Sequence, residues 1–376
     1  MKPVLTNVVL VLVSLAVSLL LAELVARLFL DPVDYLNPTL VADEFLNHRI
    51  APRTGGHDAW GFRNREVPAT ADIVCIGDSM TYGYGARARE SWPAVLATMR
   101  GERIYNMALG GYGPIQYLYL MRTDAPQLHP KIVIVALNLE NDLLDAYNMV
   151  YSHKSWSTYR TSEFADVPPP AIAPRHSGKF LGGLRDWLAT KSVLYMSITQ
   201  LPVFDFVRVR ESGYLNVDTR IAFHDTSHNV LFYLNSHIRP VDLTDPQVKA
   251  GWEITKRALL EIHNDAERKG IRLIVAIVPT KERVYRDLVE RAGYLAPDSA
   301  VKGKEVLAKA LRDEDVTRAA IIGFLQEQRI EVVDLLPALT SEVTARDAYP
   351  LTDPHPTRIG YRAMAASIDH YLGDAH

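Results

Sequence analysis

The stretch Asp72-Ile-Val-Cys-Ile-Gly-Asp78-Ser79-Met-Thr-Tyr-Gly83-Tyr-Gly85 decides the expected fold. Its apolar run from Ile73 to Ile76 predicts a buried strand, because it is short, β-branched and bounded by turn-forming residues. The run ends in Gly-Asp-Ser and a glycine-rich turn, and a helix is predicted from about Ser91. This order places the Ser79 hydroxyl at the carboxyl end of a strand, where open α/β sheets bind their ligands. Taken alone, the tripeptide is equally compatible with a tight turn that has a polar cap.

A second polar segment lies near the other end of the chain. It is Thr352-Asp353-Pro354-His355-Pro356-Thr357-Arg-Ile-Gly360, in which a carboxylate precedes an imidazole by two residues. Together the two segments offer a nucleophile, Ser79, a base, His355, and an acid that can orient the base, Asp353.

From Asp72 onward, apolar runs of strand length alternate with segments of helical periodicity. This alternation predicts a three-layer α/β/α sandwich with a mainly parallel sheet. The expected strands are Ile73 to Ile76, Arg103 to Met107, Lys131 to Leu137, Arg272 to Val278 and Glu331 to Leu335, and the expected helices include Ile115 to Arg122, Gln247 to Lys269 and Arg358 to Leu372.

The chain divides into three expected parts: residues 1–30, a membrane helix; residues 31–70, a spacer; and residues 71–376, the α/β domain. Between about 145 and 245 the alternation is lost, and this length exceeds a simple connection. We interpret that segment as an insertion that forms a lid or cap, with one short helix near Val193 to Gln200.

The apolar N-terminal segment from Val4 to Leu30 is long enough to span a hydrocarbon core of about 30 Å. A cleavable signal has a shorter apolar region and small residues at its cleavage site, so an uncleaved signal anchor is favoured. A buried core helix is the alternative. Glu23 and Arg27, spaced i, i+4, are expected near the far interface. A short N-terminal tail that stays in the cytoplasm would place the domain outside it, in the periplasm or beyond the cell.

Composition excludes several classes of protein. The 376 residues are 48% apolar and 23% charged, with a net charge of −3, so neither a nucleic-acid binder nor a polyanion trap is indicated. The single cysteine, Cys75, excludes an internal disulfide and a cysteine-rich zinc site, and its place in the first strand predicts a buried thiol.

Two further strand ends supply candidates for binding an oxyanion. The second strand runs into Asn106-Met-Ala-Leu-Gly110-Gly111-Tyr-Gly113, where a glycine N–H can approach a substrate closely. The third runs into Asn138-Leu-Glu140-Asn141-Asp142, which offers the side-chain amide of Asn141. Three strand ends therefore each deliver a polar element to the same edge of the sheet.

These residues resemble the four sequence blocks of the SGNH hydrolases, also called GDSL esterases. The blocks are Gly77-Asp78-Ser79, Gly111 in its Asn-x-x-x-x-Gly stretch, Asn141 in Asn-Asp, and His355 in Asp-x-His-Pro-Thr-x-x-Gly. Three features are similar to a bacterial membrane-anchored branch: the N-terminal helix, the Gly61-Phe62-Arg63 element and Asn141-Asp142-Leu-Leu-Asp145. The resemblance covers about residues 60 to 372, with the segment 145–245 outside it.

The resemblance implies a nucleophile, Ser79, a base, His355, and an oxyanion hole made by the N–H groups of Ser79 and Gly111 with the Asn141 side chain. It implies no metal and no organic cofactor. The family's usual acid lies three residues before the histidine, where this chain has Thr352, so Asp353 takes a spacing found in some branches. Asp78 is expected to stabilise the turn.

The expected function is a serine esterase that hydrolyses small, acetyl-like esters on an envelope glycan or similar substrate. The same residues are compatible with an O-acyltransferase that passes the acyl group to a sugar of an exopolysaccharide or cell wall. A lipase or thioesterase, and a non-catalytic envelope binding protein, are the remaining alternatives. The expected partners are the ester substrate and the membrane, without nucleic acid; protein partners and oligomeric state are not indicated.

Overall fold

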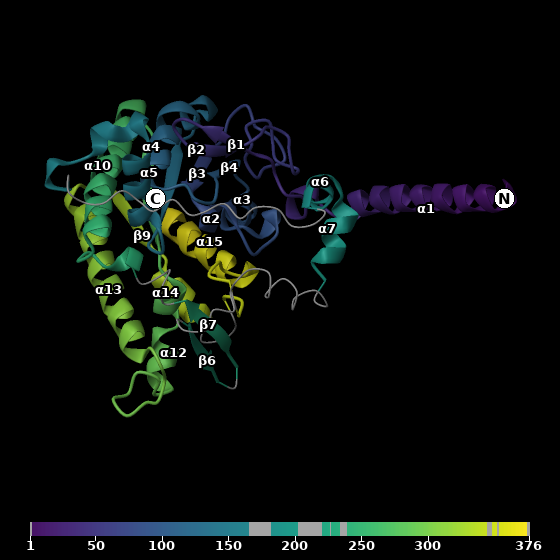
Figure 1. Cartoon of the computed structure of the whole chain (residues 1–376). Helices are drawn as coiled ribbons and strands as arrows, with labels where there is room; N and C mark the ends of the chain where they lie inside the picture. The colour runs from purple at the N-terminus through teal and green to yellow at the C-terminus, as the bar shows by residue number, and fades with distance from the viewer. Residues whose placement is uncertain are drawn as a thin grey trace. The chain divides into compact units, whose positions relative to one another are not determined.

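Five parallel strands form the central sheet of the computed structural model, which describes residues 2–164, 182–201, 220–225, 227–233, 239–343, 348–351 and 353–373 (Figure 1). Their order, β4-β3-β5-β8-β9, is the 2-1-3-4-5 order of flavodoxin-like sheets. The chain passes from β3 to β4 on one side, and then from β4 across to β5 on the other side of β3. This reversal of direction leaves a crevice between β3 and β5. The strands are β3 (Ile73–Gly77), β4 (Ile104–Ala108), β5 (Ile132–Asn138), β8 (Arg272–Val278) and β9 (Glu331–Asp334).

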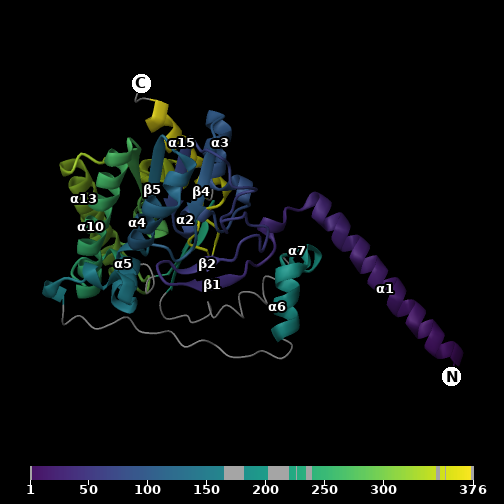
Figure 2. The same ribbon diagram turned by 90° about the horizontal axis from the view of Figure 1, so that it is seen from above.

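Helices cover both faces of this sheet (Figure 2). Alternate residues of β3 point to opposite faces, and both sets are buried, which explains the continuous apolar run that predicts the strand. One face packs against α4 (Pro114–Thr123), α5 (Asp142–Ser152) and α10 (Pro246–Lys269), and the other against α3 (Trp92–Arg100), α14 (Leu336–Val343) and α15 (Arg358–Gly373). The predicted α/β/α sandwich and its parallel sheet are therefore confirmed.

The remaining helices are shorter or lie at the margins of the sheet. These helices are α1 (Lys2–Phe29), α2 (Ser79–Tyr82), α6 (Gly182–Lys191), α7 (Val193–Thr199), α11 (Lys281–Val284), α12 (Arg286–Arg291) and α13 (Lys304–Glu327).

The thiol of Cys75 is fully buried in β3, as the sequence predicted.

The described residues group into two compact units. Of the described residues, the first unit contains 2–41, 50–61 and 182–201, and the second contains 42–49, 62–164 and those from 220 to 373. The expected spacer contains regular structure, since β1 (Leu40–Asp43) and β2 (Asn47–Ile50) pair as a two-stranded sheet.

The segment expected to be an insertion is not uniform. It contains the predicted short helix as α7, preceded by α6, and also a hairpin of β6 (Arg220–His224) and β7 (Asn229–Tyr233). Alternate hairpin residues, Ile221, Phe223, Val230 and Phe232, are buried in the same core as the sheet. This hairpin therefore packs into the core of the α/β domain, and the expected bounds of the insertion stay a prediction. Residues 165–181, 202–219, 226 and 234–238 lie outside the described part.

Candidate active site

Ser79 is the first residue of α2, directly beyond the carboxyl end of β3 (Figure 1). Asp78 caps this helix, because its Oδ1 accepts the N–H of Met80 at 2.9 Å, as expected for a turn-stabilising residue. Gly83, with φ +89°, ends α2 in the left-handed region that glycine occupies without strain. The Ser79 hydroxyl donates to Asp78 Oδ2 at 3.4 Å, and the side chain is half-buried.

Asp353 and His355 form a close pair in the loop before α15. His355 Nδ1 lies 2.6 Å from Asp353 Oδ1, and the same oxygen accepts the His355 backbone N–H at 2.8 Å. With Nδ1–H donating to the carboxylate, Nε2 of a neutral ring is left with its lone pair free to accept a proton.

The pair also shifts both pKa values. Burial disfavours the charged forms, but the hydrogen bond and the charge of the partner outweigh it. The pKa of Asp353 is therefore lowered and that of His355 is raised above its ordinary 6.5. Thr352, the residue at the family's usual acid position, lies outside the described residues.

Tyr84 connects the histidine loop to the serine turn. Its ring packs on His355 with centroids 5.4 Å apart, and its N–H donates to the Ser79 carbonyl at 3.2 Å. Its own carbonyl accepts the Tyr361 hydroxyl at 2.7 Å. In the described part of the chain the Ser79 hydroxyl donates to Asp78 and not to His355.

The two remaining predicted residues lie at the same edge. Gly111 has φ +81° and is exposed, and Gly110 lies so close to the Tyr84 ring that a Cβ there would be 2.6 Å from it. His48 contacts this turn through its Nε2, which lies 3.1 Å from the Gly110 carbonyl oxygen.

Asn141 is connected to the serine turn through Asn138. The Asn138 amide donates to Asp78 Oδ2 at 2.8 Å and to Asn141 Oδ1 at 2.7 Å. The Asn141 amide nitrogen donates to Asp145 at 2.7 Å, and because it carries two hydrogens it has a second one for another acceptor. The ends of β3, β4 and β5 thus carry Ser79, Gly111 and Asn141 at one edge of the sheet, and the loop before α15 brings Asp353 and His355 to the serine turn through Tyr84. The roles of these residues stay predictions.

The buried carboxyl group of Asp142 and the half-buried one of Asp145 hold this asparagine segment, a role that the sequence analysis did not assign to them. Asp142 accepts from the Asn138 N–H at 2.8 Å and from the Tyr117 hydroxyl at 3.0 Å. Burial raises the pKa of Asp142 well above its usual range and that of Asp145 to about 7. The sequence signal that could have indicated this role is their place one and four residues after Asn141.

Lys281 is a further residue that the sequence analysis missed. Its side chain is fully buried, and its ammonium group donates to the carbonyls of Pro350 at 2.7 Å, Leu351 at 3.2 Å and Asp353 at 3.3 Å. Burial raises the pKa of the Asp353 carboxyl group, and the contacts with His355 lower it. The charge of Lys281 is a further, smaller cause that lowers this pKa. One cation thus fixes the backbone of the loop that carries the acid and the base.

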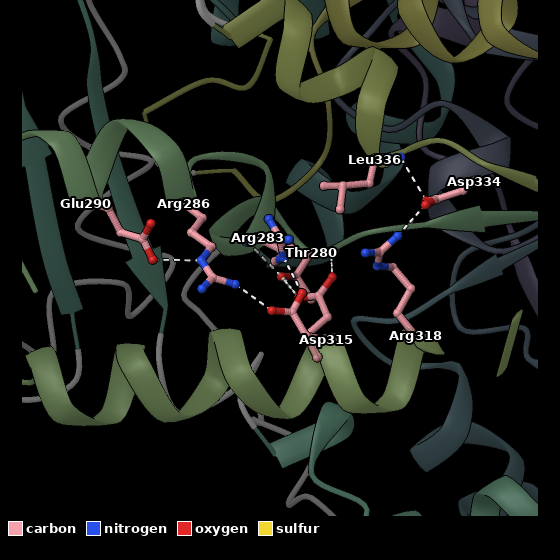
Figure 3. Close-up of polar contacts among 9 residues, drawn as sticks. Thr280, Arg283, Arg286, Glu290, Asp315, Arg318, Asp334 and Leu336 are labelled. Atoms are coloured by element: carbon pink, nitrogen blue, oxygen red, sulfur yellow. Dashed lines mark hydrogen bonds and ion pairs between the residues drawn. The ribbon is translucent and has the colours of Figure 1, made fainter. Parts of the chain in front are cut away.

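Figure 3 shows how α11, the helix that begins with Lys281, is held on α13. Thr280 caps α11 and donates its hydroxyl to Glu314, whose carboxylate also accepts the Thr280 N–H at 3.0 Å. Arg283 and Arg286 both pair with Asp315 on the next position of α13. Burial raises the pKa of Glu314 to about 7.

No group of three or more histidine, cysteine, aspartate or glutamate residues within the described ranges could hold a metal ion. The expectation that the chemistry needs no cofactor stays a prediction.

The flavodoxin-like sheet carries a serine at its β3–β5 crevice and an Asp–His pair in the loop before α15, an arrangement compatible with an α/β hydrolase. Residues 75–186 match the model of the GDSL-like lipase/acylhydrolase family, and residues 231–374 match the SGNH hydrolase-like domain of the acetyltransferase AlgX. The chain therefore carries an SGNH hydrolase domain, and the predicted resemblance is confirmed.

Solved structures of similar fold are distant in sequence. A GDSL-like lipase from Bacteroides thetaiotaomicron is 12% identical, with 81% of this chain and 88% of that chain covered and a TM-score of 0.38. A catalytic mutant of Axe2, an acetylxylan esterase from Geobacillus stearothermophilus, is 11% identical, with 82% and 96% covered and a TM-score of 0.37. Both TM-scores are below 0.5, so we base the fold assignment on the sheet order and the family models. A comparison with curated proteins found no match.

Proposed function

We propose that the protein is a membrane-anchored serine esterase that removes small, acetyl-like acyl groups from an envelope glycan or a similar substrate. The observation that carries the proposal is the Asp353–His355 pair, 2.6 Å apart, packed against Tyr84 of the serine turn. The exposed Gly111 and the half-buried Ser79 leave the same edge accessible to an ester.

The proposed reaction uses one acyl-enzyme. Ser79 Oγ forms a bond to the ester carbonyl carbon while its proton moves to His355 Nε2, and the N–H groups of Ser79 and Gly111 with the Asn141 amide stabilise the oxyanion. The C–O bond to the alcohol then breaks, and the alcohol oxygen takes the proton from His355. Water attacks the acyl-Ser79 carbonyl, gives a proton to His355, and releases the acid as Ser79 recovers that proton.

The second candidate is an O-acyltransferase, in which a sugar hydroxyl replaces water in the second half of the reaction. The match of residues 231–374 to a domain described as that of an acetyltransferase favours this alternative. The two candidates share every step up to the acyl-enzyme.

We further propose that α1 anchors the protein and that the SGNH domain faces the periplasm or the cell exterior. The helix Val4–Phe29 is long and apolar enough to cross a membrane, and no part of its most apolar window is buried within the protein. The same composition is also found in signal sequences.

The test is turnover of aryl acetate and of a longer-chain aryl ester by the full chain in detergent, beside Ser79→Ala and His355→Ala. We expect acetate release that both substitutions reduce by several powers of ten. Adding an acetylated donor and a glycan acceptor separates the two candidates, because a transferase forms acylated sugar in preference to free acetate. Turnover that is indifferent to Ser79, or none from a folded protein with either assay, would contradict the proposal.

A further inference from the structure

The carboxyl-terminal part of α1 is bound to the start of α7 through one carboxylate. Glu23 accepts hydrogen bonds from the Ser192 hydroxyl at 2.8 Å and from the N–H groups of Val193 and Leu194, both at 2.9 Å. These donors lie at the amino terminus of α7, where unpaired N–H groups and the helix dipole favour an anion. Glu23 therefore serves as a cap that comes from a helix about 170 residues away in the chain.

Arg27, one turn further along α1, fixes the end of α6 in the same way. Its guanidinium pairs with Glu23 at 2.7 Å and donates to the carbonyl of Lys191, the last residue of α6. The junction between α6 and α7 is thus attached to α1 at both of its helix ends, and Figures 1 and 2 show the two short helices beside this end of α1.

The position of Glu23 along α1 sets the depth of this junction in a bilayer. The 19 residues from Val4 to Ala22 span about 28 Å at about 1.5 Å per residue, close to the thickness of a hydrocarbon core. Glu23 and the amino terminus of α7 then fall at the boundary between acyl chains and headgroups.

Large apolar side chains are exposed on the helices that meet at this junction. Leu184 and Trp187, spaced i, i+3 on α6, are 54% and 58% exposed, whereas Asp186 lies on another side of the helix. Ile198 and Leu201 are exposed at the end of α7, and Leu28 and Phe29 at the end of α1. Exposed apolar side chains therefore occur on α1 and on both short helices attached to it.

We propose that α6 and α7 form an interfacial membrane element, with Leu184 and Trp187 inserted at the boundary between headgroups and acyl chains of the bilayer that α1 spans. The proposal rests on the proposed membrane anchoring by α1. Lipid is the occupant that fits, because both short helices are attached to the end of the proposed membrane helix. In addition, tryptophan and leucine on a short amphipathic helix favour this boundary.

The test uses single labels on the full chain reconstituted in vesicles of phosphatidylcholine and phosphatidylglycerol. Leu184→Cys and Trp187→Cys carry an environment-sensitive fluorophore, and Asp186→Cys on the same helix is the matched control. The native Cys75 is buried and gives little background labelling. Val13→Cys, in the middle of α1, reports whether the anchor itself is in lipid. Quenching by lipids with brominated acyl chains and by aqueous iodide is measured for each label.

We expect brominated lipid to quench the labels at 184 and 187 several-fold more than the label at 186, with the opposite order for iodide. Glu23→Ala should abolish this difference, because it removes the cap that holds α7. If Val13 is quenched by lipid but 184 and 187 match 186, the inference fails while the anchor stands. Labels at 184 and 187 that are shielded from both quenchers would indicate a protein partner and overturn it. A label at 13 that is open to iodide would overturn the anchor together with the inference.

Discussion

At the scale of single residues, the Asp353–His355 pair makes a prediction about pH. A base must be neutral to accept the serine proton, and the carboxylate of Asp353 raises the pKa of His355, so kcat/KM should rise with pH through a value above 6.5. Asp353→Asn removes that charge, so the acid limb should move to lower pH while the maximal rate falls about 10²- to 10⁴-fold. The measurement is the pH profile of aryl acetate hydrolysis.

A second Asp–His pair in the chain provides the control for this experiment. His228 Nδ1 lies 2.8 Å from Asp225 Oδ2 in the turn of the β6–β7 hairpin. Asp225→Asn changes the same chemistry away from the serine turn and should leave the acid limb unchanged. If the acid limb of the pH profile is unchanged in Asp353→Asn, then Asp353 does not set the pKa of the base, and its proposed role is contradicted.

Lys281 gives a second prediction at this scale. Lys281→Met removes three charge-assisted hydrogen bonds to the loop of Asp353, so kcat/KM should fall about 10- to 100-fold, since such a bond contributes about 1.5–3 kcal/mol. The loss of its charge should also raise the pKa of Asp353, which a merely structural lysine would not change. The pH profile and the melting temperature are measured together.

Lys304 is the matched control, because its ammonium also binds three carbonyls, those of Ala296, Pro297 and Ser299. Lys304→Met should lower stability without moving the pH profile. Equal effects of the two substitutions on that profile would show that Lys281 does not position the loop.

Motifs revealed Ser79, Gly111, Asn141, Asp353 and His355, because each is polar and follows a predicted strand or precedes a predicted helix. Lys281 has no such signal, since its three acceptors are backbone carbonyls, which every sequence supplies. Asp142 and Asp145 lie in the first turn of α5, where acidic residues are common. The sequence therefore does not indicate that the side chain of Asp142 is fully buried.

At the scale of elements, the strands were predictable and one long helix was not. The three central strands, β3, β5 and β8, are buried on both faces, and their sequences are therefore almost wholly apolar. Helix α13 buries Glu314 and Thr317 among its apolar residues, and these polar side chains interrupt the pattern that indicates an amphipathic helix.

The β6–β7 hairpin was interpreted as part of an insertion, and its burial predicts a cost that an independent lid would not have. Phe223→Ala should destabilise the domain by about 3–5 kcal/mol, because the ring is fully buried in the core beside the sheet. Leu231→Ala, at a half-buried position of the same hairpin, should cost less. Urea unfolding of both variants checks this, and an unchanged midpoint for Phe223→Ala would contradict it.

The joint between α11 and α13 makes stability depend on pH. The pKa of Glu314 is raised from 4.5 to about 7, so the folded state binds more protons than the unfolded state between these values. Stability from this group is present below about pH 4.5 and decreases as pH rises to 7, by up to about 3 kcal/mol. Glu314→Gln should therefore stabilise the protein at pH 8 and have little effect at pH 5, as measured by urea unfolding.

The neighbouring Asp315 tests the predicted direction in which stability changes with pH. Contacts with Arg283 and Arg286 lower its pKa against the effect of burial, so its contribution is present at both pH values. Asp315→Asn should lower stability at pH 5 and at pH 8 alike. A stabilisation of Glu314→Gln at pH 5 as large as at pH 8 would rule out titration of Glu314 as the cause.

At the scale of the whole molecule, the chain combines an SGNH domain with a second unit that sequence order conceals. That unit joins α1 to α6 and α7 through pairs such as Glu23 with Ser192, and no local pattern predicts a contact over such a separation. The sequence indicated only that Glu23 and Arg27 lie near an interface.

This joining predicts the fate of α1. A signal sequence that is removed has no need of contacts with the mature protein, whereas Glu23 and Arg27 complete the ends of α7 and α6. We therefore expect α1 to be retained, so that mass spectrometry of the protein extracted from membranes finds peptides of residues 2–30 and an intact mass near 42.1 kDa. Alkaline carbonate should leave the protein in the membrane pellet. A mature chain that begins after Phe29 would contradict retention, and α6 and α7 would then lose the carboxylate and guanidinium that cap them.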